Sequence, residues 1–207
     1  MIDHTTLITY ILIVLGFVFI PGPATLVTMA RAASSGTRVG IATGAGIAAG
    51  DLIHTSMAIA GLSAIIATSA LLFSIVKYAG AAFLIYLGIR AMLDRAPIEL
   101  NGAPAIGAGR AFRQAVLTEV LNPKTALFFL AFLPQFVRPE HGSTALQLAT
   151  LGAVFVLLGL LSTIVFAVGA GRLGNLLRRH PAVVKWQGKV VGTIYCAVGA
   201  RLALQER

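Results

Sequence analysis

Charged side chains are scarce in this sequence. Asp, Glu, Lys and Arg make up 11% of its 207 residues, whereas hydrophobic residues make up 57%. Soluble domains carry roughly 25% charged residues, so a soluble fold of this length has too little polar surface to cover so many apolar side chains. The composition excludes the soluble classes and favours an integral membrane protein.

Cysteine and histidine are also rare. The single cysteine, Cys196, has no second thiol with which to form a disulfide or share a metal ion, so we interpret it as a small buried residue. The four histidines lie on different segments and form no paired motif. An intramembrane enzyme needs metal ligands or a nucleophile beside a base. We therefore predict that the protein is not an enzyme and uses no metal or cofactor.

Long apolar segments are what the chain has in abundance. A membrane-spanning helix takes about 20 apolar residues to cross a hydrocarbon core of about 30 Å, and six runs reach that length. None alternates in the pieces of about 10 residues that are typical of membrane strands. We predict a single all-α membrane domain over residues 1–207 with six transmembrane helices, near Leu7–Met29, Val39–Ala67, Leu71–Leu93, Ala115–Val137, Leu146–Ala170 and Pro181–Leu204.

The net charge of +9 indicates membrane topology rather than a nucleic-acid partner. Most of the 16 Lys and Arg residues fall in alternate loops, on one predicted side of the membrane. Loops rich in Lys and Arg stay in the cytoplasm. This distribution places both termini outside, and we predict that the protein binds no nucleic acid.

The six runs divide into two sets of three. Asp94 to Arg110 has the Gly, Ala and Pro content of a linker, and Pro23-Ala24-Thr25 near the start of one set resembles Pro123-Lys124-Thr125 in the other. Because three is odd, the second set enters the membrane from the opposite side, as in inverted-repeat transporters. We predict a first repeat over 1–93, a cytoplasmic linker over 94–112 and a second repeat over 113–207.

Proline motifs interrupt the first and fourth runs. Pro21-Gly22-Pro23 stands where a helix should continue, and Asn122-Pro123 repeats the arrangement in the second set. An interior proline costs about 3 kcal/mol or more, whereas Pro is favourable at the first position of a new helix and Asn is a preferred N-cap. We predict that each helix is broken into two half-helices, whose new starts attract anions. The alternative is an ordinary proline kink.

Four polar side chains lie deep in the predicted membrane region. Asp51 is near the middle of the second run and His54 is one turn later on the same face, while Glu119 and Lys124 flank the second break. A charge at the bilayer centre costs at least about 2.5–3.5 kcal/mol, so each needs a partner or a function. Three alternatives stay open: an ion pair between Asp51 and Lys124, a packing role for His54, and solvation of Glu119 at the cytoplasmic boundary.

Together these groups fit a zwitterion. Carboxylates accept the ammonium of an amino acid, and the helix starts with Lys124 bind its carboxylate. A buried carboxylate also exchanges protons and so couples transport to a proton gradient. We predict proton coupling at Asp51, Glu119 and His54, and substrate binding at Pro21, Gly22, Pro23, Asp51, Asn122, Pro123 and Lys124.

On these motifs the sequence resembles the lysine-exporter superfamily of bacterial amino-acid efflux proteins, especially its homoserine/threonine-resistance branch. The matching residues are Pro21-Gly22-Pro23, Gly50-Asp51, Leu121-Asn122-Pro123-Lys124 and the stretch from there to Phe136. The resemblance covers essentially the whole chain. It implies a multi-pass protein of the bacterial inner membrane that exports amino acids by proton antiport. A neutral amino acid such as threonine or homoserine is favoured, because Asp51 is the one clearly central acid and the α-ammonium would occupy it.

Two other kinds of membrane protein remain as alternatives. A passive channel for small solutes and a membrane scaffold protein both fit six apolar helices. Saturable, proton-sensitive flux that is lost on Asp51→Asn argues against both. The expected partners are an amino acid, protons and the lipid bilayer. A homodimer stays open, because the Gly-rich helix faces pack equally well within one chain or between chains.

Overall fold

The structure, a computed structural model, describes residues 2–19, 23–68, 70–93, 104–179 and 181–204. These residues form helices and connecting turns, with no strand among them. Two short 3₁₀ turns, Leu133–Phe136 and Pro139–His141, precede the seventh helix. The α-helices are α1 (His4–Phe19), α2 (Pro23–Ser35), α3 (Thr37–Thr68), α4 (Ala70–Leu93), α5 (Ala108–Val120), α6 (Pro123–Ala131), α7 (Thr144–Arg179) and α8 (Pro181–Leu204).

The two predicted breaks coincide with helix boundaries. The bend between α1 and α2 is 48°, and the bend between α5 and the segment that begins with α6 is 49°. A new helix begins at Pro23 and another at Pro123. Pro21 and Gly22 lie outside the described residues, as do residues 94–103 of the predicted linker, and α5 begins within that linker, at Ala108.

The helices are consistent with an all-α membrane protein, although length and composition identify fewer than six spans. Within the described residues, Thr144–Ala170 is long and apolar enough to cross a membrane alone, and each bent pair qualifies if it counts as one span. Large apolar side chains cover the outside: Leu12 is 63% exposed and Val168 is 65% exposed. The number of spans, the opposite orientation of the repeats and the outer position of the termini remain predictions.

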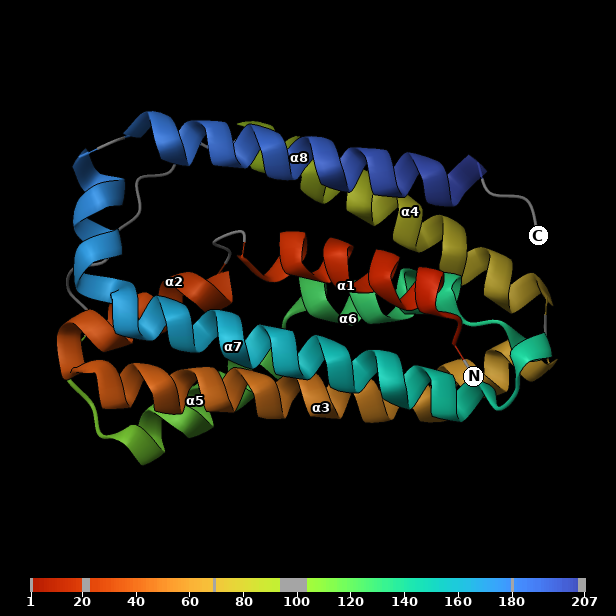
Figure 1. The fold of residues 1–207 in the computed structure, drawn as a ribbon, viewed down its shortest axis with the longest axis horizontal. Helices are drawn as coiled ribbons and strands as arrows, with labels where there is room; N and C mark the ends of the chain where they lie inside the picture. The colour runs from red at the N-terminus through yellow and green to blue at the C-terminus, as the bar shows by residue number, and fades with distance from the viewer. Residues whose placement is uncertain (1, 20–22, 69, 94–103, 180, 205–207) are drawn as a thin grey trace.

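The helices are arranged in layers (Figure 1). Helices α3, α5 and α7 pack together on one side, with α3 and α7 antiparallel, and α4 pairs with α8 on the other side. Helices α1 and α6 lie between these two layers. One half of each broken helix, α1 and α6, is thereby brought into the interior.

Aromatic side chains fill the space between the layers. The ring centroid of Phe17 on α1 lies 4.4 Å from that of Phe128, 5.8 Å from that of Phe155 and 5.6 Å from that of Tyr195. These rings come from α1, α6, α7 and α8 and meet at tilted angles, which aromatic pairs prefer over face-to-face stacking. The cluster joins the two layers next to the breaks.

Glycines bring α3 and α7 into close contact at two levels. A Cβ atom at Gly44 would lie 2.5 Å from Thr163 Oγ1, and one at Gly152 would lie 2.7 Å from Thr55 Oγ1. Small residues allow membrane helices to approach in this way. Asp51 of α3 and Gly159 of α7 lie between the two levels.

Gly152→Ala should destabilise the protein. The added methyl group would overlap Thr55 and force α3 and α7 apart, and overpacking of this kind costs about 1–3 kcal/mol. Gly61→Ala on exposed α3 surface, where a Cβ meets nothing within 4 Å, is the matched control. Thermal unfolding in detergent should show a lower Tm for Gly152→Ala than for Gly61→Ala. Equal Tm values would contradict the close contact.

Candidate functional site

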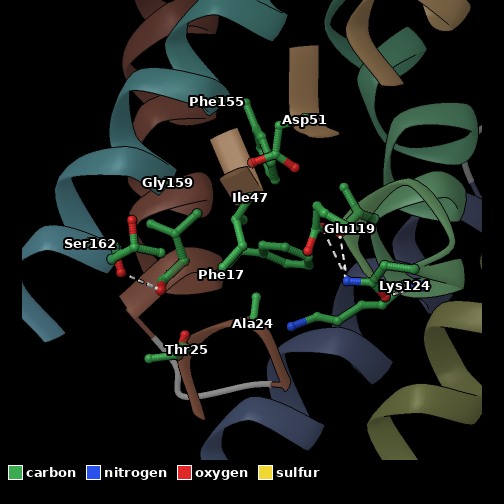
Figure 2. A pocket seen from close by; sticks show the side chains of 14 residues that line it. Phe17, Ala24, Thr25, Ile47, Asp51, Glu119, Lys124, Phe155, Gly159 and Ser162 are labelled. Carbon is green, nitrogen blue, oxygen red and sulfur yellow. Dashed lines mark hydrogen bonds between the residues drawn. The ribbon is translucent and has the colours of Figure 1, made fainter. Parts of the chain in front are cut away.

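A cavity lies where the two helix breaks face the long helices α3 and α7. The empty space between its lining residues is about 480 Å³, which includes space open to the surroundings of the protein. The ends of α1 and α5, the first turns of α2 and α6, and the middle of α3 and α7 line it (Figure 2).

The cavity brings together four of the nine predicted site residues, and His54 is not among its lining residues. Asp51, Glu119, Asn122 and Lys124 line it. Pro23 and Pro123 are the first residues of α2 and α6, directly before lining residues, whereas Pro21 and Gly22 lie outside the described residues.

Other lining residues were missed in the sequence. They are mostly small, hydroxylated or aromatic. The Pro-x-Thr repeat is a signal that could have identified two of them, the threonines that follow the breaks. The remaining ones carry no local signal, because they belong to the apolar background of their helices. The missed residues include Phe17, Thr25, Thr125, Phe155, Gly159 and Ser162.

Glu119 is held by hydrogen bonds from the start of α6. The Thr125 hydroxyl donates to Glu119 Oε1 at 2.5 Å, and Asn122 Nδ2 donates to the same oxygen at 3.1 Å. Asn122 Oδ1 also accepts a hydrogen bond from the backbone N–H of Lys124 at 3.0 Å, as an N-cap does. Glu119 is 2% exposed, so it is enclosed by protein rather than solvated at a boundary.

Two carboxyl oxygens at the cavity are buried without a hydrogen-bond partner in the described part of the chain. They are Asp51 Oδ1 and Glu119 Oε2. Nearly all buried polar atoms in proteins are hydrogen-bonded, so such orphans at a cavity need an explanation. A proton or a bound cationic group supplies one.

Lys124 presents its ammonium group to aromatic rings. Its Nζ atom lies 4.3 Å from the centroid of the Phe17 ring and 5.4 Å from that of Tyr195, both within the range of cation–π attraction. Among the described residues no carboxylate lies within ion-pair distance of it, so the ion pair with Asp51 that the sequence left open is not formed. The donors of the ammonium group remain available to an anion.

His54 and Ser162 bind the carbonyl ends of the two breaks. His54 Nε2 lies 2.9 Å from the backbone oxygen of Glu119 near the end of α5, and Ser162 Oγ donates to the backbone oxygen of Val18 near the end of α1 at 2.6 Å. A carbonyl only accepts hydrogen bonds, so Nε2 of His54 carries the hydrogen and donates. Helix ends leave carbonyl groups without partners, and these two side chains help to satisfy them.

Comparison with known proteins gives a consistent result. A profile of the LysE type translocator family matches residues 15–206. The chain is 33% identical over 184 residues to a Salmonella typhimurium protein named homoserine/homoserine lactone efflux protein, covering 88% of each chain. It is 30% identical over 197 residues to an uncharacterized membrane protein of Vibrio cholerae, covering 95% of each chain. No solved structure matches the chain.

Thr125→Val should lower stability through Glu119. The valine keeps the shape of the side chain but removes a hydrogen bond to a buried carboxyl group, a loss of about 1–3 kcal/mol. Thr118→Val is the matched control, because the exposed Thr118 hydroxyl bonds only to the backbone of its own helix, at Gln114. A lower Tm in detergent is expected for Thr125→Val alone. If both variants unfold together with wild type, the bond contributes nothing.

Proposed function

The chain belongs to the LysE type translocator family, and we propose that it exports amino acids across the bacterial inner membrane by proton antiport. One observation carries the proposal. Within the described part of the chain, one cavity holds carboxyl oxygens without a hydrogen-bond partner, at Asp51 and Glu119, together with the ammonium group of Lys124, which has no carboxylate partner there. Acidic and basic groups in one site are what a zwitterion requires.

The two charges of the substrate have separate places in the cavity. In the view of Figure 2, Asp51 lies on one side of the Phe17 ring, and Lys124 with the first turn of α2 lies on the other. We assign the substrate ammonium to Asp51 and the substrate carboxylate to Lys124 and the helix starts at Pro23 and Pro123, where backbone N–H groups favour an anion. A neutral amino-acid side chain brings no third charge to the cavity.

Proton coupling follows from competition for the same oxygens. A carboxylate binds the substrate ammonium, whereas a proton on that carboxyl group removes the charge that holds it. Asp51 and Glu119 each have an oxygen free for either occupant. His54 takes part indirectly, because its ring fixes the backbone at Glu119. Exchange of a proton for an amino acid in each cycle is antiport.

We also propose six spans in two inverted repeats with both termini outside. Gly44 and Gly152, Thr55 and Thr163, and His54 and Ser162 are pairs with the same separation in the sequence, so one alignment of the two repeats matches all three. The glycine of each copy contacts the threonine of the other copy, which gives the two close contacts between α3 and α7. His54 and Ser162 each bind a backbone carbonyl at one of the two breaks. Thr25 and Thr125, two residues after the prolines that begin α2 and α6, both line the cavity. Paired features of this kind support a duplication, and the loop charges support the orientation.

Asp51→Asn should strongly reduce export. Cells that express the protein are loaded with dipeptides, which they hydrolyse, and amino acids appearing outside are measured over time. Loss of the carboxylate removes a charge-assisted contact, and we expect a fall of about tenfold or more. Glu140→Gln, at an exposed acid in the second 3₁₀ turn, is the control and should leave export unchanged. A protonophore should stop export by the wild type.

The same assay separates the alternatives. Non-saturable flux that ignores the protonophore indicates a channel. No flux of any amino acid, with the protein present in the membrane, leaves a scaffold protein or a transporter of another zwitterion.

Lys124→Gln should reduce export of an amino acid more than export of its lactone. Homoserine carries a carboxylate and homoserine lactone does not, whereas both carry the ammonium group assigned to Asp51. We expect export of homoserine to fall about tenfold or more, because a hydrogen bond to a charged group is lost, and export of the lactone to change less. Lys189→Gln, at an exposed lysine of α8, is the control. Equal losses for both compounds would contradict the assignment of Lys124.

A further inference from the structure

Gly159 differs from the other buried glycines whose neighbours the structure describes. At each of those others a Cβ atom would come within 3 Å of another group, so glycine is required for close packing. At Gly159 a Cβ atom would have one neighbour within 4 Å, Asp51 Oδ2 at 3.5 Å, which is ordinary contact. Packing therefore does not require a glycine at this position.

Glycine at position 159 nevertheless carries a disadvantage. It lies inside the long helix α7, and glycine is among the least favourable residues in a helix interior. Gly159 also lines the cavity. Glycine at position 159 is thus neither needed for packing nor favourable for the helix. Its effect is to keep the adjacent cavity free of a side chain.

The close contacts on either side prevent α3 and α7 from adjusting to a larger residue. Gly152 packs against Thr55 on one side of this level, and Gly44 packs against Thr163 on the other. The distance between the helices is thus fixed above and below Gly159. A side chain at position 159 has to extend into the cavity beside Asp51.

We infer that Gly159 sets the largest amino-acid side chain that the protein exports. This inference rests on the proposed function. When the ammonium nitrogen of a substrate contacts Asp51, the α-carbon bonded to that nitrogen also lies near Asp51. The space next to Asp51 therefore holds the α-carbon and the first atoms of the substrate side chain. The missing side chain of Gly159 provides that space. The proposed duplication adds a second reason, because the alignment that matches His54 with Ser162 also matches Asp51 with Gly159. One repeat supplies the carboxyl group, and the other supplies the space beside it.

The test measures side-chain selectivity. Purified wild type, Gly159→Ala, Gly159→Ser and Gly61→Ala are reconstituted in proteoliposomes with a proton gradient, and transport of glycine, alanine, threonine, homoserine, leucine, methionine and phenylalanine is measured separately. For both Gly159 variants we expect transport of the largest wild-type substrates to fall about tenfold or more relative to the smallest, because a single methyl group in a pocket discriminates by about 10–200-fold. Gly61→Ala should keep the wild-type ranking.

Each other outcome overturns the inference. An unchanged ranking in the Gly159 variants, or an equal loss for every substrate, shows that Gly159 does not select by size. Failure of both variants to fold, measured by their Tm in detergent, shows that the space for a Cβ atom is absent. Either result leaves the proposed function standing if the wild type transports amino acids. Absence of transport by the wild type rejects the proposed function, and the inference with it.

Discussion

A helix that is interrupted inside a membrane protein leaves backbone N–H and C=O groups without partners, and lipid offers none. In this chain each break meets that constraint with polar side chains. Asn122 caps the start of α6, His54 binds a carbonyl near the end of α5, and Ser162 binds one near the end of α1. The position of the cavity follows from this arrangement, because the breaks are tolerated only where the long helices α3 and α7 can reach them.

The charges of the cavity follow from the same constraint. Glu119 is positioned by the cap residue Asn122 and by Thr125, which belongs to the first turn of α6. One of its oxygens is thereby occupied, and the other, like Asp51 Oδ1, has no hydrogen-bond partner among the described residues. The aromatic rings of Phe17 and Tyr195 hold the Lys124 ammonium without neutralising it. The described part of the chain therefore holds acidic and basic groups in one cavity without pairing them, which is the arrangement that the proposed zwitterion site requires.

Local sequence signals predicted the backbone of the site well and its contacts poorly. The Asn122-Pro123 cap and the position of Asp51 in an apolar run were readable, since caps and intramembrane charges are local features. The aromatic partners of Lys124 were not, because Phe17 and Tyr195 lie in other helices and look like ordinary apolar residues. The hydrogen bond of His54 could not be predicted for the same reason, because it joins α3 to α5 and no local pattern indicates a contact between helices. Gly159 was hidden among packing glycines, from which it differs only in its three-dimensional neighbours.

The two glycine contacts between α3 and α7 also have a mechanical consequence. The separation of these helices is fixed on both sides of the cavity, by the contact of Gly44 with Thr163 and by that of Gly152 with Thr55. The two helices therefore form one rigid unit. The half-helices α5 and α1 are bonded to these long helices near their inner ends, through His54 of α3 and Ser162 of α7. The distance between the two walls of the cavity that α3 and α7 form is therefore set by glycine packing on both sides, independently of what the cavity holds.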